Sequence, residues 1–431
     1  MSNFKPTSYT LQCVATGHEF ADHGWDLADK ECCEPSLVRA IYEKKKIEVK
    51  EELGFYRFCD WLPVKRMLKG SAAPVTFRSK ALAAHLGLEN LYITLNGYSP
   101  AHGAKMTTCS FKETEAYSVC GRMSDDEKRV LVVASAGNTA RAFAKVCSEN
   151  NIRLLLSVPA DNLDAMWFEK PLNPCVKLIA CEKGGDYFDA IRLSDMALQS
   201  PMFFAEGGAK NVARRDGMAT TMLSAATTIG RIPDYYFQAV GSGTGAIAAW
   251  EANLRLIEDG GYGDNLAKLM VSQNAPFVPM YDAWRADSRE MLPYEPHRAR
   301  RDASIIDAKV LSNRKPPYGI KGGLYDALKA TDGDILVVTN AQSRKAARLF
   351  EELEGIDIHP AAAVATASLI KAVEGGQVDK KATIMLNITG AGEKRFKAEH
   401  EVFQLQPEKV FPLNVEADAV IEAVEAMFTE E

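Results

Sequence analysis

The sequence predicts an α/β protein with mostly parallel sheets covered by helices, arranged as two domains behind a small N-terminal extension. Short, wholly apolar segments such as residues 130–133 recur along the chain, and such runs are typical of strands buried on both faces of a parallel sheet. Each run leads through a polar or glycine-rich turn into a segment with helical periodicity, and this alternation favours parallel β-α-β units. With 431 residues, of which 47% are hydrophobic, the chain can form two substantial cores.

The expected elements follow one another in order, and we divide them among an N-terminal extension (1–65), a smaller α/β domain (66–205) and a larger one (206–431). The predicted strands are residues 91–95, 130–133, 152–158, 176–179, 235–240, 269–271, 335–338 and 384–388. The predicted helices are residues 79–86, the segment after Lys112, an alanine-rich segment after Thr139, residues 187–198, residues 217–228, and the segment after Gly245. Residues 276–317 have no regular pattern and are expected to form a surface loop or a lid over the substrate.

Charge and composition exclude several classes of protein. A formal net charge of -6 argues against a protein dedicated to nucleic acid or to an anionic membrane surface. No apolar run approaches the length that crosses a bilayer, and the polar first ten residues lack the pattern of an export signal. Nine scattered cysteines, an odd number, indicate free thiols, so we expect a cytoplasmic protein.

The N-terminal extension contains cysteines and histidines without the spacing of a metal site. A zinc ribbon would need paired C-x-x-C motifs, whereas Cys13 has no partner three residues on and Cys32 and Cys33 are adjacent. We therefore expect an eroded, ribbon-like module and no metal.

The turn Thr107–Glu113 carries a lysine, Lys112, at what should be the first turn of a helix. Helix N-termini disfavour cations, so a lysine there needs a compensating interaction, and a covalently bound phosphorylated aldehyde would supply one. Lysine forms Schiff bases with pyridoxal phosphate (PLP) when it is deprotonated, which the helix dipole encourages. The alternative is a solvated surface lysine.

Glycines 241, 243 and 245 lie between a predicted strand and a predicted helix, where backbone amides and the helix dipole can hold a phosphate group. The same letters fit a dinucleotide fingerprint, but that site needs an acidic residue after the next strand. Here that strand ends at Val271-Ser272-Gln273, so a different phosphate fits better. An ordinary tight turn remains the alternative.

Two further turns follow predicted strands. In Ser135-Ala136-Gly137-Asn138-Thr139 the backbone amides can bind a carboxylate and Asn138 can donate to a phenolate oxygen, although Ser135 or Asn138 could equally be a helix cap. Thr389 places a hydroxyl at the carboxyl end of the last strand, where ligands of open α/β sheets collect, or is simply a turn residue.

Together these motifs make the chain resemble PLP-dependent enzymes of the tryptophan synthase β fold type, closest to the threonine synthase group, over roughly residues 55–400. Ser110-Phe111-Lys112 matches the start of the family's S-F-K-D-R, and residues 135–139 match its S-S-G-N-T loop. The resemblance implies that Lys112 carries PLP and acts as general base, and that Asn138 binds the ring's phenolate oxygen. It also implies that Gly241, Ser242, Gly243, Thr244 and Gly245 hold the phosphate, and that Thr389 bonds the pyridine nitrogen.

The departures from the group flank the substrate pocket. Glu113-Thr114 replaces Asp-Arg after the lysine, and Ala101–Met106 replaces a short N-P-T-G approach. The pattern most resembles the members of this group that make L-cysteate for coenzyme M biosynthesis in methanogenic archaea. That resemblance implies a transferase (β-replacement, EC 2.5.1 type) that exchanges the phosphate of L-phosphoserine for sulfite. Ser135, Gly137 and Thr139 would bind the substrate carboxylate, with Lys105 and Thr108 as candidates for the anionic group.

Three alternatives remain open at this level: a threonine synthase acting on phosphohomoserine, an NAD-dependent oxidoreductase using the glycine cluster, and a catalytically silent PLP-binding protein. The missing acid after Val271 argues against the second, and the intact set of Lys112, Asn138 and Thr389 against the third. We expect small-molecule substrates and a homo-oligomer.

Overall fold

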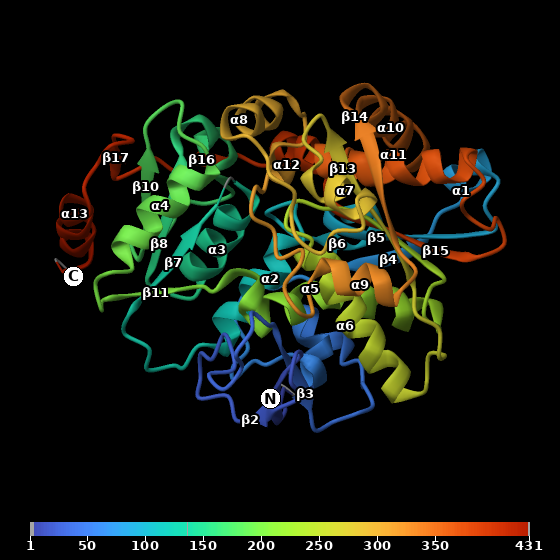
Figure 1. Cartoon of the computed structure of the whole chain (residues 1–431), viewed down its shortest axis with the longest axis horizontal. Coiled ribbons are helices and arrows are strands. Elements are labelled where there is room, and N and C mark those ends of the chain that lie inside the picture. The colour runs from blue at the N-terminus through green and yellow to red at the C-terminus, as the bar shows by residue number, and fades with distance from the viewer. Residues whose placement is uncertain (1–3, 136, 430–431) are drawn as a thin grey trace.

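The computed structural model describes residues 4–135 and 137–429, and it contains two open sheets lying side by side with helices packed against them (Figure 1). Every strand pair inside the smaller sheet is parallel, and so are the pairs among β14, β13, β12, β15 and β5 in the larger one. The mostly parallel, helix-covered architecture predicted from the sequence is therefore confirmed.

The smaller sheet has the strand order β11-β7-β8-β10-β17. Its three central strands, β7, β8 and β10, are mostly apolar and buried, because helices cover both faces of the sheet there, whereas the short edge strand β17 is largely exposed. The strands are β7 (Val130–Ala134), β8 (Leu154–Pro159), β10 (Val176–Cys181), β11 (Phe203–Ala205) and β17 (Lys409–Phe411). The helices beside them are α3 (Asn138–Glu149), α4 (Tyr187–Ala197) and, at the outer edge in Figure 1, α13 (Ala417–Thr429).

The larger sheet has the order β14-β13-β12-β15-β5-β4, with β6 paired to β5. Its strands are β4 (Val75–Arg78), β5 (Asn90–Ser99), β6 (Ala104–Lys105), β12 (Tyr235–Ala239), β13 (Lys268–Ala275), β14 (Asp334–Thr339) and β15 (Thr383–Ala391). The helices that accompany it are α1 (Ala81–Leu86), α5 (Val212–Ile229), α6 (Thr244–Asp259), α7 (Pro279–Arg285), α9 (Leu324–Ala330), α10 (Asn340–Glu354), α11 (Pro360–Glu374) and α12 (Glu393–Glu399).

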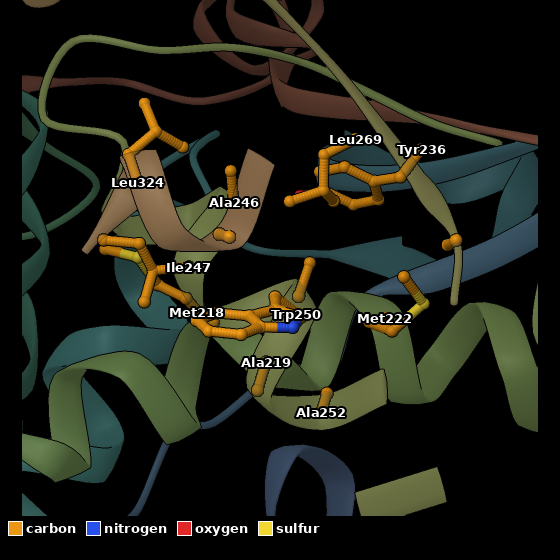
Figure 2. Close-up of a cluster of buried hydrophobic side chains, with 14 of the residues drawn as sticks. Met218, Ala219, Met222, Tyr236, Ala246, Ile247, Trp250, Ala252, Leu269 and Leu324 are labelled. Atoms are coloured by element: carbon orange, nitrogen blue, oxygen red, sulfur yellow. The ribbon is translucent and has the colours of Figure 1, made fainter. Parts of the chain in front are cut away.

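A cluster of apolar side chains joins two of these helices to the larger sheet. Figure 2 shows Met218 and Met222 of α5 near Trp250 of α6, with Tyr236 and Leu269 above them on the sheet. All five side chains are buried. Burying apolar surface contributes roughly 25 cal/mol per Å², so this cluster anchors α6 firmly, and the glycine turn that precedes α6 is anchored with it.

The N-terminal extension folds as a small antiparallel sheet with the order β2-β1-β3, formed by β1 (Tyr9–Cys13), β2 (Glu19–Phe20) and β3 (Val38–Tyr42). It rests on α5 and α6: the Tyr42 hydroxyl donates to Asp216 at 2.6 Å, and Arg39 Nε donates to Glu251 at 3.2 Å. Among the described residues, no three His, Cys, Asp or Glu side chains are grouped closely enough to hold a metal ion. A 3-10 helical segment, η1 (Glu51–Trp61), leads from the extension to β4.

Most sequence-predicted elements are present, with shifted ends. Helix α2 (Lys112–Arg122) begins at the predicted lysine, and the segment 276–317 contains α7, α8 (Pro296–Ile305) and the short turn η5 (Lys309–Leu311). The small antiparallel sheet was not predicted. No helix in the described ranges is both long and apolar enough to span a membrane.

The predicted division at residues 65 and 205 does not follow the sheets. Strands β4 and β5 precede residue 205 but belong to the larger sheet, whereas β17 comes from the C-terminal part and completes the smaller one. The order of strands in a sheet depends on pairing between distant segments, which local sequence patterns do not encode. The domain boundaries therefore remain a prediction.

Candidate active site

A cavity of about 950 Å³ lies between elements of the two sheets. The smaller sheet's side contributes the turn after β7, the start of α3 and the start of α4. The larger sheet's side contributes the glycine turn before α6, the end of β15 and the segment around η5. Lys112, Ser135, Gly137, Asn138, Thr139, Thr389 and every residue from Gly241 to Gly245 line this cavity. The fold therefore brings together turns that lie up to 277 positions apart in the sequence.

Backbone pairing holds Lys112 beside the end of β15. The amide of Phe111 donates to the carbonyl oxygen of Thr389 at 3.0 Å, and the amide of Ala391 donates to that of Cys109 at 3.1 Å. Cys109 has a φ of 53°, a left-handed conformation that non-glycine residues rarely adopt, and it turns the chain toward α2. These bonds place Lys112, the first residue of α2, next to the Thr389 side chain that lines the same cavity.

The amine of Lys112 lies among charged groups at the base of the cavity. Its Nζ atom is 3.0 Å from Glu115 Oε2, and the side chain is one-fifth exposed, toward the cavity. Burial lowers the pKa of Lys112 below its ordinary value; Glu115 opposes this shift and Arg214 adds to it. A lowered pKa increases the fraction of neutral amine, which is the nucleophilic form.

The turn from Gly241 to Gly245 can cradle a phosphate group because it exposes backbone amides at the start of the sixteen-residue helix α6. Glycine is required at several of these positions. A Cβ at Gly241 would lie 2.8 Å from the Val310 carbonyl oxygen, and one at Gly245 would lie 2.6 Å from Gln238 Nε2. Gly243 has a φ of +78°, which side chains disfavour. The hydroxyls of Ser242 and Thr244 are 2.8 Å apart in the same turn.

The turn after β7 is held by a buried arginine. Arg141 stacks on Trp167, with its guanidinium carbon 4.4 Å from the ring centroid, and it donates to the Thr108 carbonyl oxygen at 2.9 and 3.2 Å. It also donates to Asn138 Oδ1 at 3.2 Å. Because the amide oxygen of Asn138 is already engaged, its Nδ2 group is the end available for donation into the cavity. Ser135 Oγ accepts from the Gly137 amide at 3.0 Å, and Ala136, between them, lies outside the described residues.

Two predicted substrate residues, Lys105 and Thr108, are not among the residues that line this cavity. Lys105 is exposed on β6, and the Thr108 hydroxyl donates to Glu113 at 2.8 Å. Their assignment to the anionic group of the substrate remains a prediction.

Several charged residues that local motifs did not single out line the cavity instead. The cations are Arg192, Lys210, Arg214, Lys309, Arg314 and Lys315, and the carboxylates are Asp186 and Asp195. Arg314 contacts Asp186 across the two sides of the cavity. The basic residues of the irregular segment 276–317 were the available sequence signal.

His359 also lines the cavity, at the start of α11, and its Nε2 atom is 3.0 Å from Glu393 Oε2. Burial raises the pKa of the Glu393 carboxyl, but His359, Arg141 and Lys397 together hold it well below its usual range. Glu393 is therefore a fixed negative charge behind the cavity wall. No local sequence signal marks this pair, since α11 and α12 meet only in the folded chain.

Residues 71–390 match the family described as "Pyridoxal-phosphate dependent enzyme", so the chain belongs to the pyridoxal-phosphate-dependent enzyme family. Among solved structures it is similar to maize serine racemase, with a TM-score of 0.57 and 13% identity over 76% of this chain and 91% of that one. A threonine deaminase from Solanum lycopersicum gives a TM-score of 0.54 and 17% identity over 74% of this chain and 83% of that one. The fold is thus the expected tryptophan synthase β type.

Much closer similarity is found to curated proteins named cysteate synthase. The one from Methanosarcina mazei is 48% identical over 402 residues, covering 93% of this chain and 96% of its own. The one from Methanocella paludicola is 46% identical over 415 residues, covering 96% and 95%. These relatives span nearly the whole chain, including most of the N-terminal extension.

The residues present fit PLP, the cofactor of this family. One cavity, large enough for a cofactor and a small substrate, is lined by three suitable features. They are the Lys112 amine with its lowered pKa, the glycine turn at the start of α6, and the Asn138 side chain, whose Nδ2 group is available as a donor. The glycine turn lacks side chains at Gly241 and Gly245, where an added Cβ would lie too close to neighbouring atoms.

Proposed function

We propose that this protein is a cysteate synthase: with PLP it removes phosphate from L-phosphoserine and adds sulfite at the same carbon, giving L-cysteate. The near full-length relatives named cysteate synthase support this assignment. The reaction is a β-replacement, which makes the enzyme a transferase of the EC 2.5.1 type. In it a carbon–oxygen bond breaks, a carbon–sulfur bond forms, and phosphate leaves as sulfite enters.

The observation that carries the proposal is the charge of the cavity. Of the side chains that line it in the described chain, seven are lysine or arginine and only two are carboxylates. Phosphoserine and sulfite each bring an anionic group in addition to the cofactor's phosphate, and cations or N–H donors must neutralise them. Lys309, Arg314 and Lys315, which line the cavity from the segment around η5, are the cations we assign to the departing phosphate and the entering sulfite.

The other roles follow from position. When bound, PLP supplies the electron sink that lets the α-proton and the β-phosphate leave. Lys112 Nζ takes that proton and later returns it, since the neutral amine is within the cavity and favoured by burial. Ser135, Gly137 and Thr139, with the amides at the start of α3, bind the substrate carboxylate.

Asn138 Nδ2 donates to the cofactor's phenolate oxygen, and residues 241–245 hold its phosphate. The Thr389 hydroxyl forms a hydrogen bond with the pyridine nitrogen. A hydroxyl, unlike a carboxylate, need not protonate that nitrogen, which limits charge delocalisation and favours elimination over transamination. Asn138 and Thr389 therefore tune the same ring from two elements, α3 and β15.

The test is to incubate the purified protein with PLP, L-phosphoserine and sulfite, and to measure L-cysteate by mass spectrometry and released phosphate in parallel. We expect both products in equal amounts, and neither with Lys112→Ala. Phosphohomoserine should give no threonine. Formation of threonine from phosphohomoserine, without cysteate from the first pair, would overturn the proposal in favour of a threonine synthase.

We also propose that the protein acts in the cytoplasm as a homo-oligomer. All nine cysteines are free thiols, which supports a reducing compartment. Light scattering of the purified protein measures the oligomeric state, and a monomeric mass would contradict this part of the proposal.

A further inference from the structure

Behind Lys112 lies a line of alternating charges that the proposed reaction does not yet use. Glu115, one helical turn after Lys112 on α2, has a side chain with no exposed surface. Its Oε2 atom is 3.0 Å from Lys112 Nζ, and its Oε1 atom is 3.2 Å from Arg214 Nη2 on α5. Arg214 Nε in turn donates to Glu206 Oε1 at 2.8 Å.

The outer end of this line is fixed to the backbone. Glu206 follows β11, and its second oxygen accepts from the Gly208 amide at 2.9 Å. Burial raises the pKa of Glu206, Arg214 lowers it and Glu115 raises it again. Tyr187 of α4 also lies beside this cluster, next to Arg214, and burial raises its pKa too. The four charges Lys112, Glu115, Arg214 and Glu206 thus form one connected, largely buried set, which borders the cavity at Lys112 and Arg214.

A carboxylate without exposed surface is costly unless cations compensate it, because charges lose their hydration when they are buried. Glu115 meets this condition with Lys112 on one side and Arg214 on the other. Removing the proton from Lys112 would leave Glu115 and Glu206 sharing the single cation Arg214. The protonated amine is therefore favoured by Glu115 and opposed by Arg214, so the two residues act on Lys112 with opposite signs.

We propose that Glu115, held by Arg214 and Glu206, is the positioning residue of Lys112. It aims the amine at the cavity and stabilises the ammonium form that Lys112 takes when it accepts a proton. The proposal rests on the PLP family and on the position of Lys112, and not on phosphoserine or sulfite. Its failure and that of the proposed function are therefore separable.

The chain offers a matched control in the same helical turn. Glu113 also has no exposed surface, but it faces away from the cavity toward Thr108 and Lys145, whose Nζ atom is 3.5 Å from Glu113 Oε1. Glu113→Gln removes an equally buried carboxylate without touching Lys112. It reports the effect of such a loss on the fold alone.

The experiment measures the pKa of Lys112 in the full-length protein in two ways that do not need turnover. In the protein freed of PLP, formaldehyde with a borohydride reductant labels Lys112, and mass spectrometry of its peptide gives the labelling rate at each pH. In addition, the dissociation constant of PLP is measured against pH, since only the neutral amine bonds to the aldehyde.

We expect Glu115→Gln to lower the pKa of Lys112 by about 1 to 3 units, the usual effect of an opposite charge at this distance. The labelling rate at a fixed pH below that pKa then rises at least about tenfold. Loosening of the structure cannot imitate this result, because exposure to water would raise the lowered pKa of Lys112 toward its ordinary value. Glu113→Gln should leave this pKa unchanged.

Two more variants keep the proposal testable if Glu115→Gln does not fold. Glu206→Gln removes the farther carboxylate and should lower the pKa of Lys112 by less, whereas Arg214→Gln removes the opposing cation and should raise it. A Lys112 pKa that does not move, or rises, in Glu115→Gln would overturn the proposal. So would an equal fall in Glu113→Gln.

Discussion

The close approach of α2 and α5 at Gly217 sets the position of Lys112. A Cβ at Gly217 would lie 2.4 Å from the carbonyl oxygen of Thr114 and 2.8 Å from the Cβ of Ser118, both on α2. Ordinary van der Waals contact begins at 3.4 Å, so Gly217→Ala must push the two helices apart by about 1 Å. Thr114 is two residues from Lys112, and the obstacle is backbone that cannot rotate away.

We expect the extra methyl group to cost about 1–3 kcal/mol of stability, as overpacking of a tight core usually does. A displacement of about 1 Å at a reacting group lowers turnover by about 100-fold. Gly217→Ala should therefore melt at a lower temperature than the parent, form L-cysteate far more slowly and bind PLP more weakly. Circular dichroism on heating and the cysteate assay measure these effects.

Gly375→Ala is the matched control, because Gly375 follows α11 with a φ of -80° and an added Cβ would lie 3.2 Å from the Lys371 carbonyl oxygen, only about 0.2 Å inside ordinary contact at 3.4 Å. It should leave both quantities nearly unchanged. A Gly217→Ala protein with the parent's melting temperature and turnover would refute the reasoning. A lower melting temperature with normal turnover would refute the link to Lys112, since the helices would then separate without moving the amine.

Two further predictions concern single side chains of the site. Thr389→Val keeps the shape of the side chain but removes its hydroxyl. We therefore expect a folded protein whose dissociation constant for PLP rises about tenfold, which corresponds to the loss of one hydrogen bond. An unchanged dissociation constant in a fluorescence titration would mean that the hydroxyl does not contact the cofactor. Burial alone would raise the pKa of the Glu393 carboxyl, but the neighbouring cations hold that pKa below its value in the unfolded chain. The ionised carboxylate therefore stabilises the fold fully above about pH 4.3, and this stabilisation is lost as the pH falls further. Urea unfolding of the parent and of Glu393→Gln should therefore give different free energies of unfolding above that pH, and the difference should shrink as the pH falls below it. A difference that does not shrink at acid pH would contradict the assignment of the ion pairs.

Local pattern predicted the elements that carry the site. The apolar run that became β7 and the turn after it were recognisable because strand, turn and helix follow one another directly there, so that residue types at adjacent positions indicate them. The start of α2 at Lys112 and the start of α6 after the glycine turn were predicted for the same reason. The conformation of a motif that lies within one strand–turn–helix unit is therefore largely determined by its local sequence.

Contacts between distant segments were not predictable in this way. Glu115 stood at the right helical spacing from Lys112, but its importance depends on Arg214, which is 99 positions away and meets it only because α2 packs on α5. Lys105 and Thr108 are near Lys112 in sequence, yet neither is among the residues that line the cavity. Sequence distance therefore does not tell which residues line the cavity, and the assignment of Lys105 and Thr108 to the substrate remains a prediction.

By itself, the sequence determined the class of fold, the family and the turns that present Lys112, Asn138, Thr389 and the glycines, because these depend on periodicity and on residue types at adjacent positions. Only the tertiary structure decided which sheet each strand joins, which cations line the cavity and which charges surround the lysine. Those features arise from packing between segments that are far apart in the chain. A pKa or a binding charge is a property of that packing, since burial and neighbouring charges, rather than residue type, set its value.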